Sequence, residues 1–279
     1  MKEIKRAENA GFCFGVRQAI EMAEQAAAVN GGGIYSMGSL IHNEMVTDDL
    51  AKKGISIIND LSQVDAGATV IIRSHGEGKK FYDEAAEKNI NLVDATCPFV
   101  GKIHKLVYET DKNVIIVGDR NHPEVMGIFG WCDGPATVVD SYEEAKSLEG
   151  DDFFVVTQTT IRQEMLDEVL RGLRENNKKL VVNNTICSAT SKRQDSCKAL
   201  AEESDLMIVI GGRNSSNTKK LYEISKNSCI NTYFVENIED LPLKEVEKYN
   251  KIGVAAGAST PERIIKEVIA RMSDMTLEN

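Results

Sequence analysis

Three cysteines in this 279-residue chain could together hold a metal ion or an iron–sulfur cluster. Cys13, Cys97 and Cys187 are nearly evenly spaced, 84 and then 90 residues apart, and each stands where a strand pattern gives way to a helix pattern. A cysteine at a helix N-terminus has its thiolate stabilised by the helix dipole, and the thiolate is the form that binds metal. Three thiolates leave a fourth position open on a tetrahedral metal or a cubane cluster, which indicates chemistry rather than scaffolding.

Iron–sulfur clusters and zinc are the soft-ligand candidates for such a set. A single free cysteine is as often a small buried apolar residue, but three at the same point of a repeat are poorly explained in that way. Their wide separation differs from the clustered pairs of zinc ribbons and suits a site at a junction of domains. Cys132, Cys197 and Cys229 lack the pattern, and we interpret them as structural.

Polar side chains collect where predicted strands end and helices begin. His42, His122 and the run 214–217 occupy equivalent turns of the repeats, and later strands end in equivalent polar residues: His75, Thr159, Thr160 and Ser259. Helix N-termini with hydroxyl, amide and imidazole donors are typical of phosphate sites, although one serine or asparagine alone would more often be a simple N-cap. The recurrence across the repeats therefore predicts an anion site.

Two further titratable residues have open interpretations. Glu124 follows His122 by two residues, so it could deliver protons near a metal site or complement the dipole of a helix whose first turn it occupies. His104 lies within a predicted helix beside Lys102 and Lys105, and we interpret it as a surface or packing histidine.

The elements that position these residues recur in the same order three times. A helix follows each cysteine, at 15–28, 98–110 and 189–203. Two apolar strands with polar ends come next in each repeat, at 34–38 and 69–76, 114–118 and 153–160, and 206–212 and 252–260. A third helix follows, at 79–89, 162–176 and 261–274, and closing strands at 90–96 and 180–186 lead into the next cysteine. The third repeat has no closing strand, so we infer that the N-terminal segment supplies it.

Strands that alternate with helices predict an α/β protein with parallel sheets, whose ligands lie at the carboxyl ends of the strands. We expect three pseudo-threefold-related α/β domains with small, mostly parallel sheets. Their predicted ranges are 14–96, 97–186 and 187–279, the last completed by segment 1–13.

Composition excludes several other classes. The chain has 33 basic and 43 acidic residues, a net charge of −10, which argues against a nucleic-acid partner. No apolar stretch approaches the ~20 residues that span a bilayer, so we expect no membrane partner. The first residues lack the apolar core of a secretory signal. Six cysteines in such a chain indicate thiols or metal ligands rather than a disulfide framework. We therefore expect a cytoplasmic protein.

The polar and cysteine segments match a known family. They are AGFCFGVRQAI, GSLIHN, IRSHG, DATCPFV, GDRNHPEV, TQTT, RNSSNT and GASTPE, and they extend from about residue 10 to residue 262. The chain resembles the IspH/LytB family of 4-hydroxy-3-methylbut-2-enyl diphosphate reductases. The resemblance implies three α/β domains around a central cavity that holds the cluster. It implies a [4Fe–4S] cluster held by Cys13, Cys97 and Cys187, with one iron free of protein ligands. It also implies reductive dehydroxylation of (E)-4-hydroxy-3-methylbut-2-enyl diphosphate to isopentenyl and dimethylallyl diphosphate, the last step of the methylerythritol phosphate route to isoprenoids.

The resemblance also assigns roles by position. Glu124, His122 and Thr159 would be catalytic, with Thr159 holding the substrate hydroxyl and Glu124 delivering protons. The residues that would bind the substrate and its diphosphate are His42, His75, His122, Thr159, Thr160, Ser215, Ser216, Asn217 and Ser259. No G-x-G-x-x-G opens a helix after a strand, so electrons would come from an external donor. The resemblance implies a small carrier such as ferredoxin or flavodoxin.

On the residue pattern alone, two alternatives stay open. One is a zinc-dependent hydrolase or deaminase of a phosphorylated metabolite, which would be colourless. The other is a non-catalytic iron–sulfur redox sensor, which would need the cluster but neither Glu124 nor the anion site.

Overall fold

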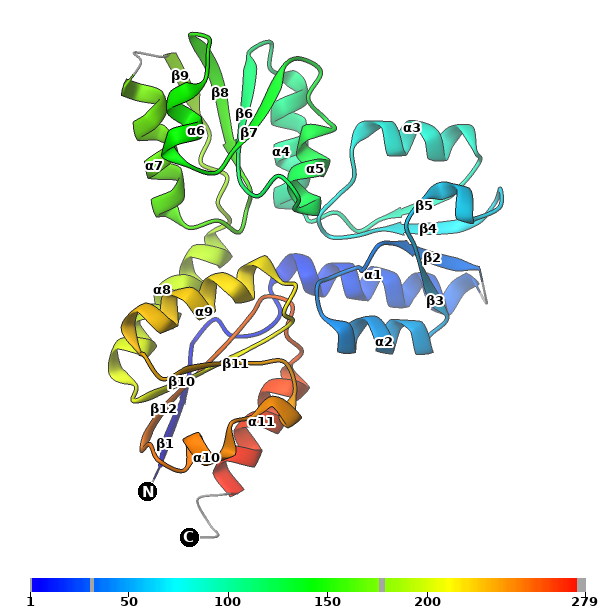
Figure 1. The fold of residues 1–279 in the computed structure, drawn as a ribbon. Helices are drawn as coiled ribbons and strands as arrows, with labels where there is room; N and C mark the ends of the chain where they lie inside the picture. Colours follow the sequence, from blue (N-terminus) through cyan, green and yellow to red (C-terminus); the bar gives the residue numbers. More distant parts are fainter. Residues whose placement is uncertain (1, 31–32, 176–178, 275–279) are drawn as a thin grey trace. The chain divides into compact units, whose positions relative to one another are not determined.

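The computed structural model describes residues 2–30, 33–175 and 179–274. They form three separate four-stranded sheets in which every pair of neighbouring strands is parallel. Helices alternate with the strands along the chain (Figure 1). The predicted α/β class with three small parallel sheets is therefore confirmed. The outermost residues of the predicted ranges, 1, 176 and 275–279, lie outside the described residues.

The first sheet has the strand order β3-β2-β4-β5. Its strands are β2 (Ile34–Met37), β3 (Ile55–Ile58), β4 (Thr69–Ile72) and β5 (Asn91–Asp94). The helices of this part of the chain are α1 (Phe14–Asn30), α2 (Glu44–Lys52), the 3-10 helix η1 (Leu61–Gln63) and α3 (Lys79–Glu87). Helix α3 packs onto the sheet through Ala85, which shares a buried apolar cluster with Val70 of β4.

The second sheet has the order β7-β6-β8-β9. Its strands are β6 (Asn113–Val117), β7 (Ala136–Val139), β8 (Asp152–Thr157) and β9 (Lys179–Val182). Its helices are α4 (Pro98–Glu109), α5 (Pro123–Phe129), α6 (Tyr142–Ser147) and α7 (Gln163–Glu175). Alternate residues of β6 and β8 face opposite sides, so α4 and α5 cover one face while α6 and α7 cover the other (Figure 1).

The third sheet has the order β11-β10-β12-β1 and joins the two ends of the described chain. Its strands are β1 (Glu3–Arg6), β10 (Leu206–Ile210), β11 (Thr232–Val235) and β12 (Lys251–Ala256). Its helices are α8 (Ser188–Glu203), α9 (Ser216–Ser228), η2 (Ile238–Asp240), α10 (Leu243–Val246) and α11 (Glu262–Asp274). Strand β1 pairs in parallel with β12, with Glu3 opposite Lys251, so the N-terminal segment supplies an edge strand to this sheet.

All three sheets have the same topology. In each sheet, the first and third strands of the repeat are neighbours at the centre, and the second and fourth strands lie at the edges. In the third sheet, β1 takes the place of the fourth strand. The chain order reverses between the two central strands, and ligands of open α/β sheets bind at the carboxyl ends of such a pair. Strands β3 and β7 were not predicted, because each is an edge strand whose middle residues are exposed or half-exposed and lacks a continuous apolar run.

The chain separates into two compact units. Unit 1 comprises Met1–Val16, Ile41–Thr47 and Ser188–Asn279, and unit 2 comprises Arg17–Leu40 and Asp48–Cys187. Unit 2 holds two of the sheets and unit 1 holds the third. The boundaries of the three predicted domains stay a prediction. Among the described residues, none of the helices has the length and apolar character needed to cross a membrane.

Candidate active site

Each of the three spaced cysteines is anchored in the same way. The backbone N–H of Cys97 donates to the carbonyl of Ser74 at 3.0 Å, and that of Cys187 to the carbonyl of Thr159 at 3.0 Å. The N–H of Cys13 donates to the carbonyl of Ala258 at 3.2 Å. In every case the acceptor lies two residues beyond the third strand of a repeat. The repeats therefore present one cysteine each from an equivalent backbone position.

The chemistry of these thiols suits a soft metal group. Cys97 is the N-cap of α4, and Cys13 and Cys187 directly precede α1 and α8, so all three lie at the positive ends of helix dipoles. None of the three forms a disulfide, and each is neither buried nor fully exposed. Cys13 belongs to unit 1, whereas Cys97 and Cys187 belong to unit 2. The convergence of the three on one group stays a prediction.

Glu124 is a buried carboxylic acid bound by one residue, Thr159. Its side chain is 2% exposed, and it accepts the backbone N–H of Thr159 at 2.5 Å and the Thr159 hydroxyl at 2.7 Å. Burial raises the pKa of Glu124 to about 7, although the two hydrogen bonds from Thr159 lower it. An acid with this pKa is partly protonated at neutral pH and can donate a proton.

Thr159 also connects the acid to a cysteine. Its side chain and N–H hold Glu124, while its carbonyl accepts the N–H of Cys187. One residue thus fixes the carboxyl of Glu124 and the backbone of Cys187 with respect to each other. Thr160, the next residue, accepts a hydrogen bond from the side chain of buried Gln158 at 2.9 Å.

Two histidines of unit 2 lie together beside this acid. The rings of His75 and His122 meet edge to face, with 5.3 Å between centroids. His122 is the N-cap of α5, where its Nδ1 accepts the backbone N–H of Glu124 at 3.2 Å. Because Nδ1 is an acceptor, the neutral ring carries its proton on Nε2, which suits donation to an anion.

The loop that carries His75 is docked along α5. Trp131 donates from Nε1 to the carbonyl of Glu77 at 2.8 Å. The backbones of Gly78 and Gly130 approach so closely that a β-carbon on Gly130 would lie 2.7 Å from the Cα of Gly78. This contact at the C-terminal end of α5 fixes the loop that places His75 beside the helix N-terminus.

The remaining predicted anion ligands lie in unit 1. Ser215 caps α9, its hydroxyl accepting the N–H of Thr218 at 3.3 Å. The Ser259 hydroxyl donates to the carbonyl of His42 at 3.3 Å, and a β-carbon on Gly212 would overlap that same carbonyl. The loops that follow the two central strands β10 and β12 therefore meet at His42.

Asn217, in the first turn of α9, has a side chain that suits a polar ligand. It is 4% exposed, and among the described residues neither its amide nitrogen nor its amide oxygen has a hydrogen-bond partner. Such groups are costly to bury unpaired, so they mark a place where a ligand completes the hydrogen bonding. Half-buried Ser216 stands next to it at the start of the same helix.

Some site features were not singled out from the sequence. Gln158 is buried, and its Oε1 accepts the N–H of Asp119 at 3.1 Å while its Nε2 binds Thr160. Its position inside the segment TQTT was the available signal. His104 is buried and stacked on Trp131, so the packing half of its interpretation is correct and the surface half is wrong. The interpretation of the other cysteines as structural stays a prediction.

Comparisons with known proteins agree with this geometry. The family model described as LytB protein matches residues 4–273. The 4-hydroxy-3-methylbut-2-enyl diphosphate reductase of Thermoanaerobacter sp. (strain X514) is 46% identical over 273 residues, which cover 95% of each chain. The reductase of the same name from Clostridioides difficile (strain 630) is 41% identical over 278 residues, covering 98% of this chain and 99% of the relative.

Two solved structures share the fold over nearly the whole chain. One is (E)-4-hydroxy-3-methyl-but-2-enyl diphosphate reductase, described as the terminal enzyme of the non-mevalonate pathway, with a TM-score of 0.73 and 40% identity. It covers 98% of this chain and 100% of its own. The other, from Plasmodium falciparum, is named E-1-hydroxy-2-methyl-but-2-enyl-4-diphosphate reductase and has a TM-score of 0.92, 29% identity and coverage of 97% and 87%. With a family match over residues 4–273, this chain belongs to the LytB protein family.

Proposed function

We propose that this chain is a 4-hydroxy-3-methylbut-2-enyl diphosphate reductase of the methylerythritol phosphate pathway. It would remove the allylic hydroxyl of its substrate as water, consuming two electrons and two protons, and release isopentenyl and dimethylallyl diphosphate. The observation that carries the proposal is the hydrogen-bonded connection from Glu124 through Thr159 to Cys187. It joins a proton donor to a thiolate ligand, as a reductive removal of hydroxyl requires.

Cys13, Cys97 and Cys187 would hold a [4Fe–4S] cluster. The donor set fits this group, because thiolates are the usual ligands of iron–sulfur clusters and all three stand at helix N-termini. When bound, the cluster would supply electrons and, at an iron without a protein ligand, a Lewis acid for the hydroxyl oxygen.

Glu124 would protonate the departing hydroxyl oxygen. Its pKa of about 7 keeps part of the population protonated at neutral pH, and burial shields that proton from bulk water. The two bonds from Thr159 hold the carboxyl in one orientation, so its proton is aimed before the substrate arrives.

The diphosphate would be bound by the two polar sets described above. In unit 1, Asn217 offers an unpaired buried amide at the N-terminus of α9, where the helix dipole also favours negative charge. Ser215, Ser216, Ser259 and His42 would complete that set. In unit 2, His75 and His122 would donate from their rings. Anchoring the diphosphate orients the carbon skeleton toward the cysteines.

Electrons would come from an external one-electron carrier such as ferredoxin or flavodoxin. We also propose a cytoplasmic location, because the reducing cytoplasm keeps thiols free for metal binding. The two alternatives find no support: the relatives compared above are named as reductases, and a non-catalytic sensor would have no use for a buried acid with a raised pKa.

The test is to purify the protein without oxygen, record its visible and EPR spectra, assay iron and sulfide on the same sample, and then measure reductase turnover. A brown protein with about four irons and four sulfides per chain that converts the substrate would support the proposal. A colourless zinc protein would refute it. Should the protein emerge free of metal, the cluster is reconstituted, and failure to convert the substrate after reconstitution would also refute it.

A further inference from the structure

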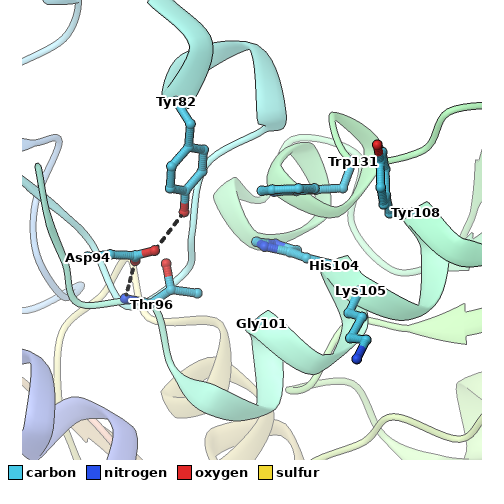
Figure 2. Close-up of a pocket in the computed structure, with 8 residues that line it drawn as sticks. All are labelled: Tyr82, Asp94, Thr96, Gly101, His104, Lys105, Tyr108 and Trp131. Carbon is cyan, nitrogen blue, oxygen red and sulfur yellow. Dashed lines mark hydrogen bonds between the residues drawn. The ribbon is translucent and has the colours of Figure 1, made fainter. Parts of the chain in front are cut away.

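Unit 2 contains a cavity that the proposed reaction does not use. Its volume is about 440 Å³, within the range of sites for small organic molecules. The residues that line it are Tyr82, Asp94, Thr96, Gly101, His104, Lys105, Tyr108 and Trp131 (Figure 2). None of them belongs to the cysteine, proton-donor or diphosphate sets described above.

One side of the cavity is a fixed aromatic wall. The indole of Trp131 stacks on the ring of His104, with 5.5 Å between centroids and 17° between planes. Tyr82 and Tyr108 meet the same indole edge to face, at 5.5 Å and 6.0 Å. Because the indole N–H is also bound to the carbonyl of Glu77, the wall is held in place before any ligand enters.

A carboxylate faces this wall across the cavity. Asp94 accepts the hydroxyl of Tyr82 at 3.0 Å and the backbone N–H of Thr96 at 2.9 Å, one on each oxygen (Figure 2). A carboxylate can accept about four hydrogen bonds, so Asp94 is oriented and still able to bind a donor. The cationic Lys105 lies at the cavity too, but it is ion-paired with Glu109 at 3.7 Å. A carboxylate beside aromatic faces favours a cationic ligand.

Gly101 indicates how closely a ligand approaches. It lies inside α4, one turn after Cys97, whose carbonyl accepts its N–H at 2.9 Å. A glycine in a helix interior destabilises the helix relative to alanine. Among the described residues, no heavy atom lies within 4 Å of a β-carbon added at Gly101, so packing within this part of the chain gives no reason for the glycine. The missing side chain instead leaves room for a flat group against the helix backbone.

We propose that this cavity binds a small planar aromatic cation, such as an arylamidinium or a protonated nitrogen heterocycle. The ring would lie against Gly101 beside the aromatic wall, with the charged nitrogen donating to Asp94. The proposal does not require the reductase activity, because no lining residue is assigned to the cysteine, proton-donor or diphosphate sets, although Trp131 also holds the loop that carries His75.

The test is calorimetric titration of the protein, purified without oxygen and loaded with its metal, using benzamidine as the probe. Benzoate is the matched control, since it has a similar shape and the opposite charge. We expect saturable benzamidine binding and none with benzoate. Trp131 is the only tryptophan, so its emission should change with the same midpoint. Asp94→Asn should weaken benzamidine binding at least tenfold. No binding, or equal binding of benzoate, would overturn the proposal.

A second variant separates ligand binding from stability. Gly101→Ala should raise the melting temperature, because alanine favours the helix and meets no neighbour, and should still weaken benzamidine binding. Gly134→Ala is the control, because its β-carbon is equally unobstructed and Gly134 does not line the cavity. Unchanged benzamidine affinity in Gly101→Ala would refute the placement of the ring against α4.

Discussion

Replacing Glu124 with glutamine should stabilise the protein at neutral and alkaline pH while removing most of its turnover. The acid is 2% exposed, and its pKa is about 7 compared with an ordinary value of about 4.5. The cause is burial, which penalises the charged form more than the two hydrogen bonds from Thr159 favour it. The negative charge that Glu124 would carry after giving up its proton therefore lowers the stability of the folded protein.

The direction of the pH dependence follows from proton binding. The unfolded chain releases this proton near pH 4.5 and the folded chain near pH 7, so between these values the folded state binds more protons. Stability from this group is complete below pH 4.5, falls as pH rises to about 7, and stays low above it. At 1.36 kcal/mol per pKa unit, the loss amounts to about 3 kcal/mol.

Glutamine is neutral throughout this range and fits the same partners. Its oxygen can accept the Thr159 N–H, and its amide can donate to the Thr159 hydroxyl, which accepts as readily as it donates. Glu124→Gln should thus gain up to about 3 kcal/mol over the parent protein at pH 8 and almost nothing at pH 4.5. Turnover should fall by roughly 10² to 10⁴, the usual contribution of a general acid.

The assay is thermal unfolding of both proteins, with matched iron content, at pH 5, 6, 7 and 8, together with steady-state turnover. Glu164→Gln, on an exposed residue of α7, reports the effect of replacing a surface carboxylate. A stability difference that is the same at pH 5 and pH 8 would refute the argument from burial. Turnover close to that of the parent would remove Glu124 from the proton transfer.

Substitutions at four other residues test the remaining parts of the site, and one of them is paired with a control substitution. Cys97→Ser should lose the cluster and activity, measured by iron, sulfide and turnover, whereas Cys132→Ser should retain both. Asn217→Ala removes the amide nitrogen that would donate to the diphosphate, so KM should rise about 10-fold to 100-fold with kcat little changed. Thr159→Ala removes a hydrogen bond that lowers the acid's pKa, so the pH profile should shift to higher pH while kcat falls. Trp131→Phe loses the hydrogen bond that fixes the loop bearing His75, so, if His75 binds the diphosphate as proposed, KM should rise while iron content stays unchanged.

The central strands could be predicted because they are buried on both faces. Strands β6 and β8 read as continuous apolar runs that end in polar residues, which is the pattern of a parallel sheet covered by helices. The order of these strands along the chain then predicted that the cysteines and polar residues stand where strands end and helices begin. The edge strands β3 and β7 have exposed or half-exposed middle residues, so their local pattern is indistinguishable from that of a loop.

The site could be predicted only to the level of which residues stand at strand ends. The pairing of Glu124 with Thr159 joins positions 35 residues apart, through the adjacent ends of β6 and β8. Without that neighbour, a proton donor and a helix-dipole partner were equally good interpretations of Glu124. Burial is what distinguishes them, because an exposed first-turn glutamate would have no cause for a raised pKa.

The three repeats share the same backbone hydrogen bonding at their cysteines but differ in their side chains, and the difference determines where a buried carboxyl is held. Ser74, Thr159 and Ala258 occupy one position, two residues after the third strand of each repeat, and each accepts the N–H of a cysteine through its carbonyl. Among the described residues, the Thr159 side chain alone of these three binds a buried carboxylic acid. Repetition of the backbone thus supplies three matched thiol positions, while a single side-chain difference links the buried carboxyl of Glu124 to the residue whose carbonyl accepts the N–H of Cys187.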